Sequence, residues 1–146
     1  MRTMSLKWIV MCAATALAAA CAHSTRGPSG PPASAEDQVA RGQKEYTEHC
    51  AKCHGAAGEG VDKKGPPVVG PSALPAEPRP GQKRKATFRT ALDVAQFVKK
   101  SMPADDPGGL SDDDYFAILA FDLKANGIDL GGKILDAAGA EQIVLH

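Results

Sequence analysis

Two cysteines and a histidine stand close together in the stretch "CAKCH", residues 50 to 54. Three chemistries use such groups: a structural zinc site, a dithiol redox pair, and covalent attachment of haem. Structural zinc takes four protein ligands, but the motif offers at most three and the chain has no second close cysteine pair. A dithiol pair accompanies a βαβ pattern, which is missing upstream of the motif. The spacing therefore predicts a haem held by Cys50 and Cys53, with His54 as a ligand to iron.

A haem iron that only transfers electrons needs a second axial ligand. Beyond the first 20 residues Met102 is the one methionine in the chain, since the other three are Met1, Met4 and Met11. Met102 precedes Pro103, and proline favours an extended backbone at the residue before it. Charged residues flank it, which is a poor setting for a core methionine. We predict Met102 as the sixth ligand, with His49 and His146 as the alternatives.

The N-terminal segment has the layout of an export signal. Residues 1–20 combine a short basic start, an uncharged apolar run and small residues before Cys21. The stretch "LAAAC" resembles the lipobox of bacterial lipoproteins, in which the cysteine carries lipid. Residues 21–35 are small, polar and rich in proline, as in a flexible tether. We therefore expect a signal peptide at 1–20, a lipid-anchored tether at 21–35, and one domain at 36–146.

The resemblance to lipoproteins implies a place for the domain. It would lie on the periplasmic side of a membrane, attached through the lipid on Cys21. Ala22, rather than aspartate, follows the cysteine, which in such lipoproteins indicates the outer membrane. The alternative is a simply secreted, soluble periplasmic protein.

The charge balance gives no reason to expect a nucleic acid partner. The whole chain has 17 basic and 17 acidic residues, and loss of residues 1–20 leaves a net charge of about −2. Charged side chains gather on both sides of Met102, and we expect a bipolar surface for partner docking there. The basic residues before it are Lys83, Arg84, Lys85, Arg89, Lys99 and Lys100, and the acidic residues after it are Asp105, Asp106 and Asp112 to Asp114.

The remaining pattern predicts helices joined by one long loop. Ser34, Thr90 and Ser111 each stand where they can cap a helix, and the helix that starts after Ser34 would carry the cysteine motif at its end. Residues 56–89 are rich in glycine and proline and predict a loop that wraps a bound haem. The third helix should bury one apolar stripe and end at Asn126-Gly127. We expect a further short helix in the tail after it. The members of that stripe are Phe116, Leu119, Ala120 and Leu123.

With these residues together, the chain resembles the class I cytochromes c from about residue 36 to 127. Gly42 and Tyr46 before the cysteine motif match the first helix of that family, and Phe121 matches the aromatic residue that packs near the helical glycine. Pro66 matches the proline whose carbonyl accepts a hydrogen bond from the proximal imidazole, and "SMP" at 101–103 matches the methionine loop. The resemblance implies an all-α fold: a small cytochrome c fold of three to five helices wrapped around one covalent haem c.

A narrower resemblance concerns residues 87–127, which are similar to single-haem cytochromes associated with quinoprotein dehydrogenases and with oxidation of sulfur compounds. It implies a one-electron carrier outside the cytoplasm that works between a dehydrogenase or respiratory donor and an acceptor such as a terminal oxidase. Two other functions remain open: a haem enzyme subunit, peroxidase-like or dehydrogenase-associated, and a haem sensor. An enzyme of the peroxidase kind requires an open position on the iron, and Met102 argues against it.

Overall fold

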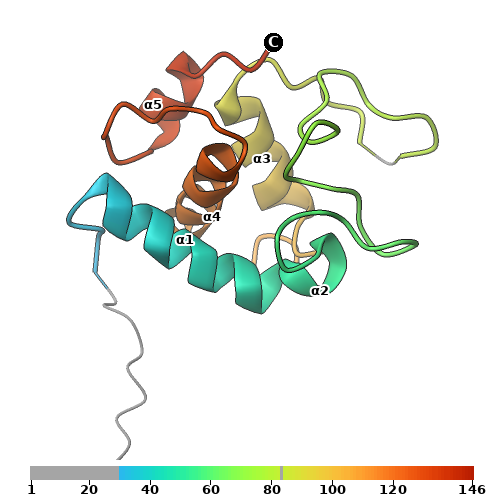
Figure 1. The fold of residues 1–146 in the computed structure, drawn as a ribbon, viewed down its shortest axis with the longest axis horizontal. Coiled ribbons are helices and arrows are strands. Elements are labelled where there is room, and N and C mark those ends of the chain that lie inside the picture. The colour runs from blue at the N-terminus through green and yellow to red at the C-terminus, as the bar shows by residue number, and fades with distance from the viewer. Residues whose placement is uncertain (1–29, 83) are drawn as a thin grey trace, which may run out of the picture.

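The computed structural model describes residues 30–82 and 84–146. These residues form five helices: α1 (Ala35–His49), α2 (Ala51–His54), α3 (Ala91–Ser101), α4 (Asp112–Ala125) and α5 (Ala137–Gln142). The same part of the chain contains two isolated β-bridges and no strand, so the predicted all-α class is confirmed (Figure 1). The expected signal segment 1–20, the lipidation site Cys21 and most of the tether lie outside the described residues.

The helices begin and end at the predicted capping residues. The hydroxyl oxygens of Ser34 and Ser111 each accept a hydrogen bond from the backbone N–H three residues on, at 3.1 and 3.2 Å. At the start of α3, the backbone N–H of Thr90 donates to the Asp93 carboxylate at 2.9 Å. After α4, Gly127 has a left-handed φ of 76°. These local bonds satisfy backbone groups that a helix end leaves unpaired.

Helices α1 and α4 cross in close contact, and the glycine in α1 makes this possible (Figure 1). A Cβ atom built on Gly42 would lie 1.9 Å from the backbone oxygen of Ala117 in α4. One turn further along each helix, the rings of Tyr46 and Phe121 pack with their centroids 5.3 Å apart. The packing of Phe121 near the helical glycine, which the family resemblance implies, is therefore confirmed.

Helix α4 is buried on more sides than the sequence predicted. Besides the expected Leu119, Ala120 and Leu123, its buried residues include Tyr115, Ala117 and Ile118. Phe116, which was expected in the stripe, is only partly buried. The physical reason is that α1 packs on one side of α4 and α3 on another, so a single apolar stripe is not enough to cover both contacts.

The tail after α4 belongs to the hydrophobic core. Leu135 and Ala140 are buried in one cluster with Phe88 and with residues of α3 and α4. The chain end also pairs with the start of α3, where the backbone N–H of Ala91 donates to the carbonyl of Ile143 at 2.9 Å. Figure 1 shows α5 and the C-terminus beside α3 and α4. The tail therefore stabilises the helices and contributes a short helix, as predicted.

The long segment between α2 and α3 forms the predicted loop along one side of the helices (Figure 1). Asn126 at the end of α4 ties this loop down, because its side-chain amide donates to the carbonyl of Val68 at 2.9 Å and accepts from the N–H of Gly70 at 3.0 Å. Arg84 holds the loop further on. Its guanidinium donates to the carbonyls of Pro75, Ala76, Glu77 and Ala86.

Among the residues described, no helix combines the length and the apolar character that crossing a membrane requires.

Candidate haem-binding site

A cleft opens between α2, the long loop, the end of α3 and one side of α4. It consists of two adjoining hollows of about 260 and 350 Å³. The volume of each hollow is within or near the range that is usual for small-molecule sites. The two hollows share the residues at their boundary, so they form one continuous site. The shared residues are His54, Lys64, Pro66, Val68, Val98, Met102 and Asp122.

The cysteine motif sits at a break in the first helical run. α1 ends at His49, Cys50 has φ of −117°, and α2 then carries the other motif residues. Cys50 and Cys53 are free thiols that line the cleft. Burial, with a contribution from the charge of Asp122, raises the pKa of the Cys50 thiol to about 12. Reactive redox cysteines have a lowered pKa, so the environment of Cys50 argues against a dithiol redox pair.

The imidazole of His54 is held in one orientation. Its Nδ1 lies 2.7 Å from the carbonyl oxygen of Pro66, so the hydrogen bond predicted for this pair is present. A carbonyl only accepts, and therefore Nδ1 carries the proton and Nε2 of the neutral ring keeps its lone pair. Gly65 allows this approach, because a Cβ atom there would lie 2.6 Å from the Cys53 carbonyl oxygen and 3.1 Å from the His54 ring. The arrangement leaves Nε2 available to bind a metal.

Met102 reaches the same cleft from the end of α3. It is the C-cap of that helix, with extended backbone at φ −133° and ψ 151°, as expected before a proline. The hydroxyl of Tyr115 in α4 donates to the backbone carbonyl of Met102 at 2.7 Å and accepts from the N–H of Gly108 at 3.1 Å. Tyr115 thus fixes both ends of the methionine loop against α4.

The other two candidate histidines have different surroundings. His146 Nε2 lies 2.7 Å from the carbonyl oxygen of Leu74, and His146 does not line the cleft. His49 borders one hollow, but its Nε2 lies 3.5 Å from the carboxylate of Glu45. Neither histidine is placed as Met102 is, in the boundary that both hollows share.

Sequence reasoning missed three residues of the site. Tyr115 was not among the predicted site residues and Asn126 was predicted only as a helix end, yet they fix the methionine loop and the long loop. Asp122 was not singled out at all, although its side chain lines both hollows. Asp122 follows Ile118 by one helical turn, and Ile118 is buried and lines the cleft. No sequence pattern indicates this position, because distant segments form the cleft.

The prediction that Arg84 belongs to an exposed docking surface is wrong, because this residue is buried. Arg84 is only 6% exposed, and its guanidinium lies over the ring of Phe88 at 4.0 Å from the centroid. Four carbonyl oxygens of the loop accept hydrogen bonds from the Arg84 guanidinium, and the loop therefore encloses this side chain. Lys99 and Asp112, from opposite sides of the bipolar surface, form an exposed ion pair at 2.6 Å. Lys83 lies outside the described residues.

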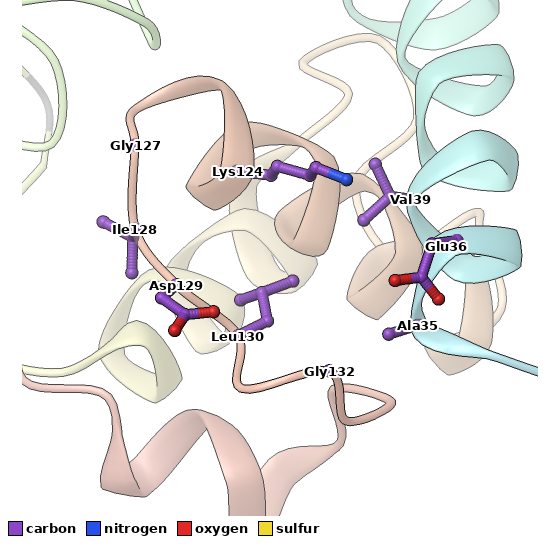
Figure 2. Close-up of a pocket in the computed structure, with 9 residues that line it drawn as sticks. All are labelled: Ala35, Glu36, Val39, Lys124, Gly127, Ile128, Asp129, Leu130 and Gly132. Atoms are coloured by element: carbon purple, nitrogen blue, oxygen red, sulfur yellow. The ribbon is translucent and has the colours of Figure 1, made fainter.

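A separate hollow of about 310 Å³ lies between the start of α1 and the segment after α4 (Figure 2). Glu36, Lys124 and Asp129 border it, and no residue of the cysteine motif does. It therefore plays no part in the cleft.

The residues of the cleft fit a haem. Two thiols could each form a thioether, one imidazole presents a free Nε2, and one thioether sulfur comes from the facing loop. Most of the remaining wall is apolar, with Val68, Val98 and Ile118 among its members, and a porphyrin requires such a surface. The donor set of histidine and methionine is the one that cytochromes c use.

Comparisons with known proteins show which family and which solved structures the chain is similar to. The family model described as "Cytochrome C oxidase, cbb3-type, subunit III" matches residues 37–121. Thiosulfate dehydrogenase of Stutzerimonas stutzeri (strain A1501) is 33% identical over 87 residues, which are 57% of this chain and 26% of that protein. The crystal structure of the sulfane dehydrogenase SoxCD from Paracoccus pantotrophus is similar with a TM-score of 0.57 at 34% identity, over 73% of this chain and 52% of that chain.

The chain therefore spans about a quarter of the first relative and about half of the second. The family match covers more than half of this chain and includes the cysteine motif, Pro66 and Met102. The chain belongs to the cytochrome c family described as cbb3-type cytochrome c oxidase subunit III, and this membership implies haem c, with its iron, as the cofactor.

Proposed function

We propose that this protein is a one-electron carrier with a single covalent haem c. Cys50 and Cys53 would form the thioether bonds, and His54 and Met102 would bind the iron. The haem supplies the Fe(III)/Fe(II) couple. The single observation that carries the proposal is that His54 and Met102, from α2 and from the end of α3, border the same cleft as both cysteines.

The side chains around the ligands support electron transfer rather than substrate turnover. Pro66 orients His54 through the 2.7 Å hydrogen bond, and Tyr115 holds the backbone of Met102 at 2.7 Å. Both side chains are thus held in place by the protein and would bind the iron without rearrangement of these segments. A methionine ligand also raises the reduction potential.

The redox partner that we propose is a dehydrogenase on the periplasmic side of the membrane, with a terminal oxidase as the acceptor. The support is the similarity to two proteins that are named dehydrogenases. The protein would be anchored through lipid on Cys21 in the outer membrane; the soluble periplasmic form is the alternative.

The names of the relatives favour a second candidate function, in which the chain is the haem subunit of a dehydrogenase. If the haem of this chain is itself the catalytic centre, the isolated protein should oxidise thiosulfate or a related sulfur compound with ferricyanide as acceptor. The electron carrier predicts no turnover by the isolated protein, together with rapid reduction once a partner dehydrogenase and its substrate are added.

Covalent attachment is tested by intact mass and by extraction with acidic acetone. We expect a mass increase of one haem over the processed chain, and the colour should stay with the protein. Replacing Cys50 or Cys53 with Ser should remove one thioether and lower the yield of holoprotein. Extraction of all colour from the wild type, or a mass without haem, would contradict the proposal.

A further inference from the structure

The carboxyl group of Asp122 is a buried polar group of the cleft that the proposed ligand set does not use. The side chain borders both hollows. Its Oδ1 atom is buried and has no hydrogen-bond partner, the one such side-chain atom among the residues described. A buried acceptor without a partner costs free energy, so its presence on the wall of the cleft requires an explanation.

The surroundings of Asp122 make its charge sensitive to pH. Burial raises the pKa of this carboxyl to about 7, so protonated and ionised forms are both accessible near neutral pH. Two neighbours respond to its negative charge: the pKa values of Tyr46 and Cys50 are both raised, first by burial and then by the charge of Asp122. Cys50 is the predicted site of a thioether, and therefore Asp122 lies beside the haem attachment.

The other titratable groups on the walls come from every element that faces Asp122. α1 contributes His49, α2 contributes Lys52, Cys53 and His54, and the methionine loop contributes Asp105. The long loop contributes Lys64, Arg79 and Arg84, all on the wall of a hollow. None of these groups forms an ion pair with Asp122 in the described part of the chain. No salt bridge among the described residues therefore holds Asp122 in its ionised form.

We propose that Asp122 is a redox-linked proton-binding site. The inference rests on the proposed function, because it requires a haem in this cleft. When a one-electron donor protein reduces the iron, the carboxylate of Asp122 takes one proton from solvent and becomes a carboxylic acid. Oxidation reverses both changes, so one electron and one proton leave the protein. The cause is electrostatic: reduction removes one positive charge from the cleft, and a nearby carboxylate then binds its proton more tightly.

The sign of the pH effect follows from the same charge. The carboxylate favours the ferric state, whereas the neutral acid does not. The reduction potential should therefore fall as pH rises through the pKa of Asp122 and be constant well above and well below it. For each tenfold difference in proton affinity between the two oxidation states, the total fall is about 59 mV for a one-electron couple.

The experiment is a potentiometric titration of the holoprotein at a series of pH values around neutrality. The test variant is Asp122→Asn, which keeps the shape and removes the charge. The matched control is Asp105→Asn, which removes the other carboxyl on the cleft wall. We expect a fall in potential with rising pH in the wild type and in the control. The Asp122 variant should keep a high potential that is independent of pH in this range.

Proton uptake provides a second measurement that needs no variant. Electrochemical reduction of the wild type in weak buffer, followed with a pH indicator, should consume a fraction of a proton per haem that peaks near the pKa of Asp122. A holoprotein with a one-electron couple but no pH dependence and no uptake overturns this inference alone. Equal pH dependence in Asp122→Asn also overturns it, because another group would then be the proton site. A chain that binds no haem overturns the proposed function as well.

Discussion

Replacing Gly42 with alanine should loosen the contact between α1 and α4 on which the cleft depends. The new Cβ atom would lie 1.9 Å from the backbone oxygen of Ala117, 2.4 Å from its carbonyl carbon and 3.0 Å from the N of Ile118. Carbon atoms pack at about 3.5 Å or more, so the helices must separate by roughly 1.5 Å. The obstacle is backbone and cannot rotate away as a side chain could.

The size of the effect follows from two opposing terms. Alanine in a helix is favoured over glycine by about 1 kcal/mol, while overpacking costs about 1–3 kcal/mol and occasionally more. Because the clash involves a rigid helix, we expect a net loss of about 2 kcal/mol in the free energy of unfolding, or about 10 °C in Tm for a domain of this size.

The assay is thermal unfolding of the holoprotein, followed by circular dichroism. The matched control is Gly139→Ala in α5. This second helical glycine has only the flexible Asp136 carboxylate at 3.3 Å and Leu135 at 3.8 Å near its Cβ position. The control should be neutral or slightly more stable. If Gly42→Ala is as stable as the wild type, the crossing does not depend on the missing side chain and the reasoning is wrong.

Three further predictions concern the methionine loop, the anchor and partner docking. Tyr115→Phe removes the hydrogen bond to Met102, so stability should fall by about 1 kcal/mol and imidazole should bind the ferric protein more tightly; an unchanged imidazole affinity would show that Tyr115 does not hold the loop. Cys21→Ser should move the protein from the membrane fraction to the soluble periplasm with its haem spectrum unchanged, and a wild type that is already soluble would refute lipidation. The rate of electron transfer with a partner should fall as salt rises, since exposed charges are screened beyond about 8 Å at physiological ionic strength; a rate that does not depend on salt would exclude docking by these charges.

The helix ends and the helix crossing could be predicted from the sequence because their causes are local. Ser34 and Ser111 cap their helices through bonds to residues three positions on. Glycine destabilises the interior of a helix relative to alanine. A glycine inside an otherwise regular helix therefore indicates that a neighbouring element approaches too closely for a side chain. The contact of Gly42 with Ala117 bears this out.

The surroundings of Arg84 and Asp122 could not be predicted, because they depend on how distant segments fold over them. A basic residue among other basic residues is usually a surface residue, yet the loop carbonyls enclose Arg84. An aspartate in the last turns of an amphipathic helix usually faces solvent. Asp122 faces the cleft because α4 is covered on several sides.

The ligand set is tested most directly by Met102→Ala, with the near-infrared spectrum and the reduction potential as readouts. The wild type should show the weak sulfur-to-iron band in its oxidised form. The variant should keep its covalent haem, lose the band, have a lower potential because the ligand that favours Fe(II) is gone, and bind carbon monoxide rapidly. A wild type without the band, together with a variant whose potential hardly changes, would contradict the assignment of Met102 as the sixth ligand.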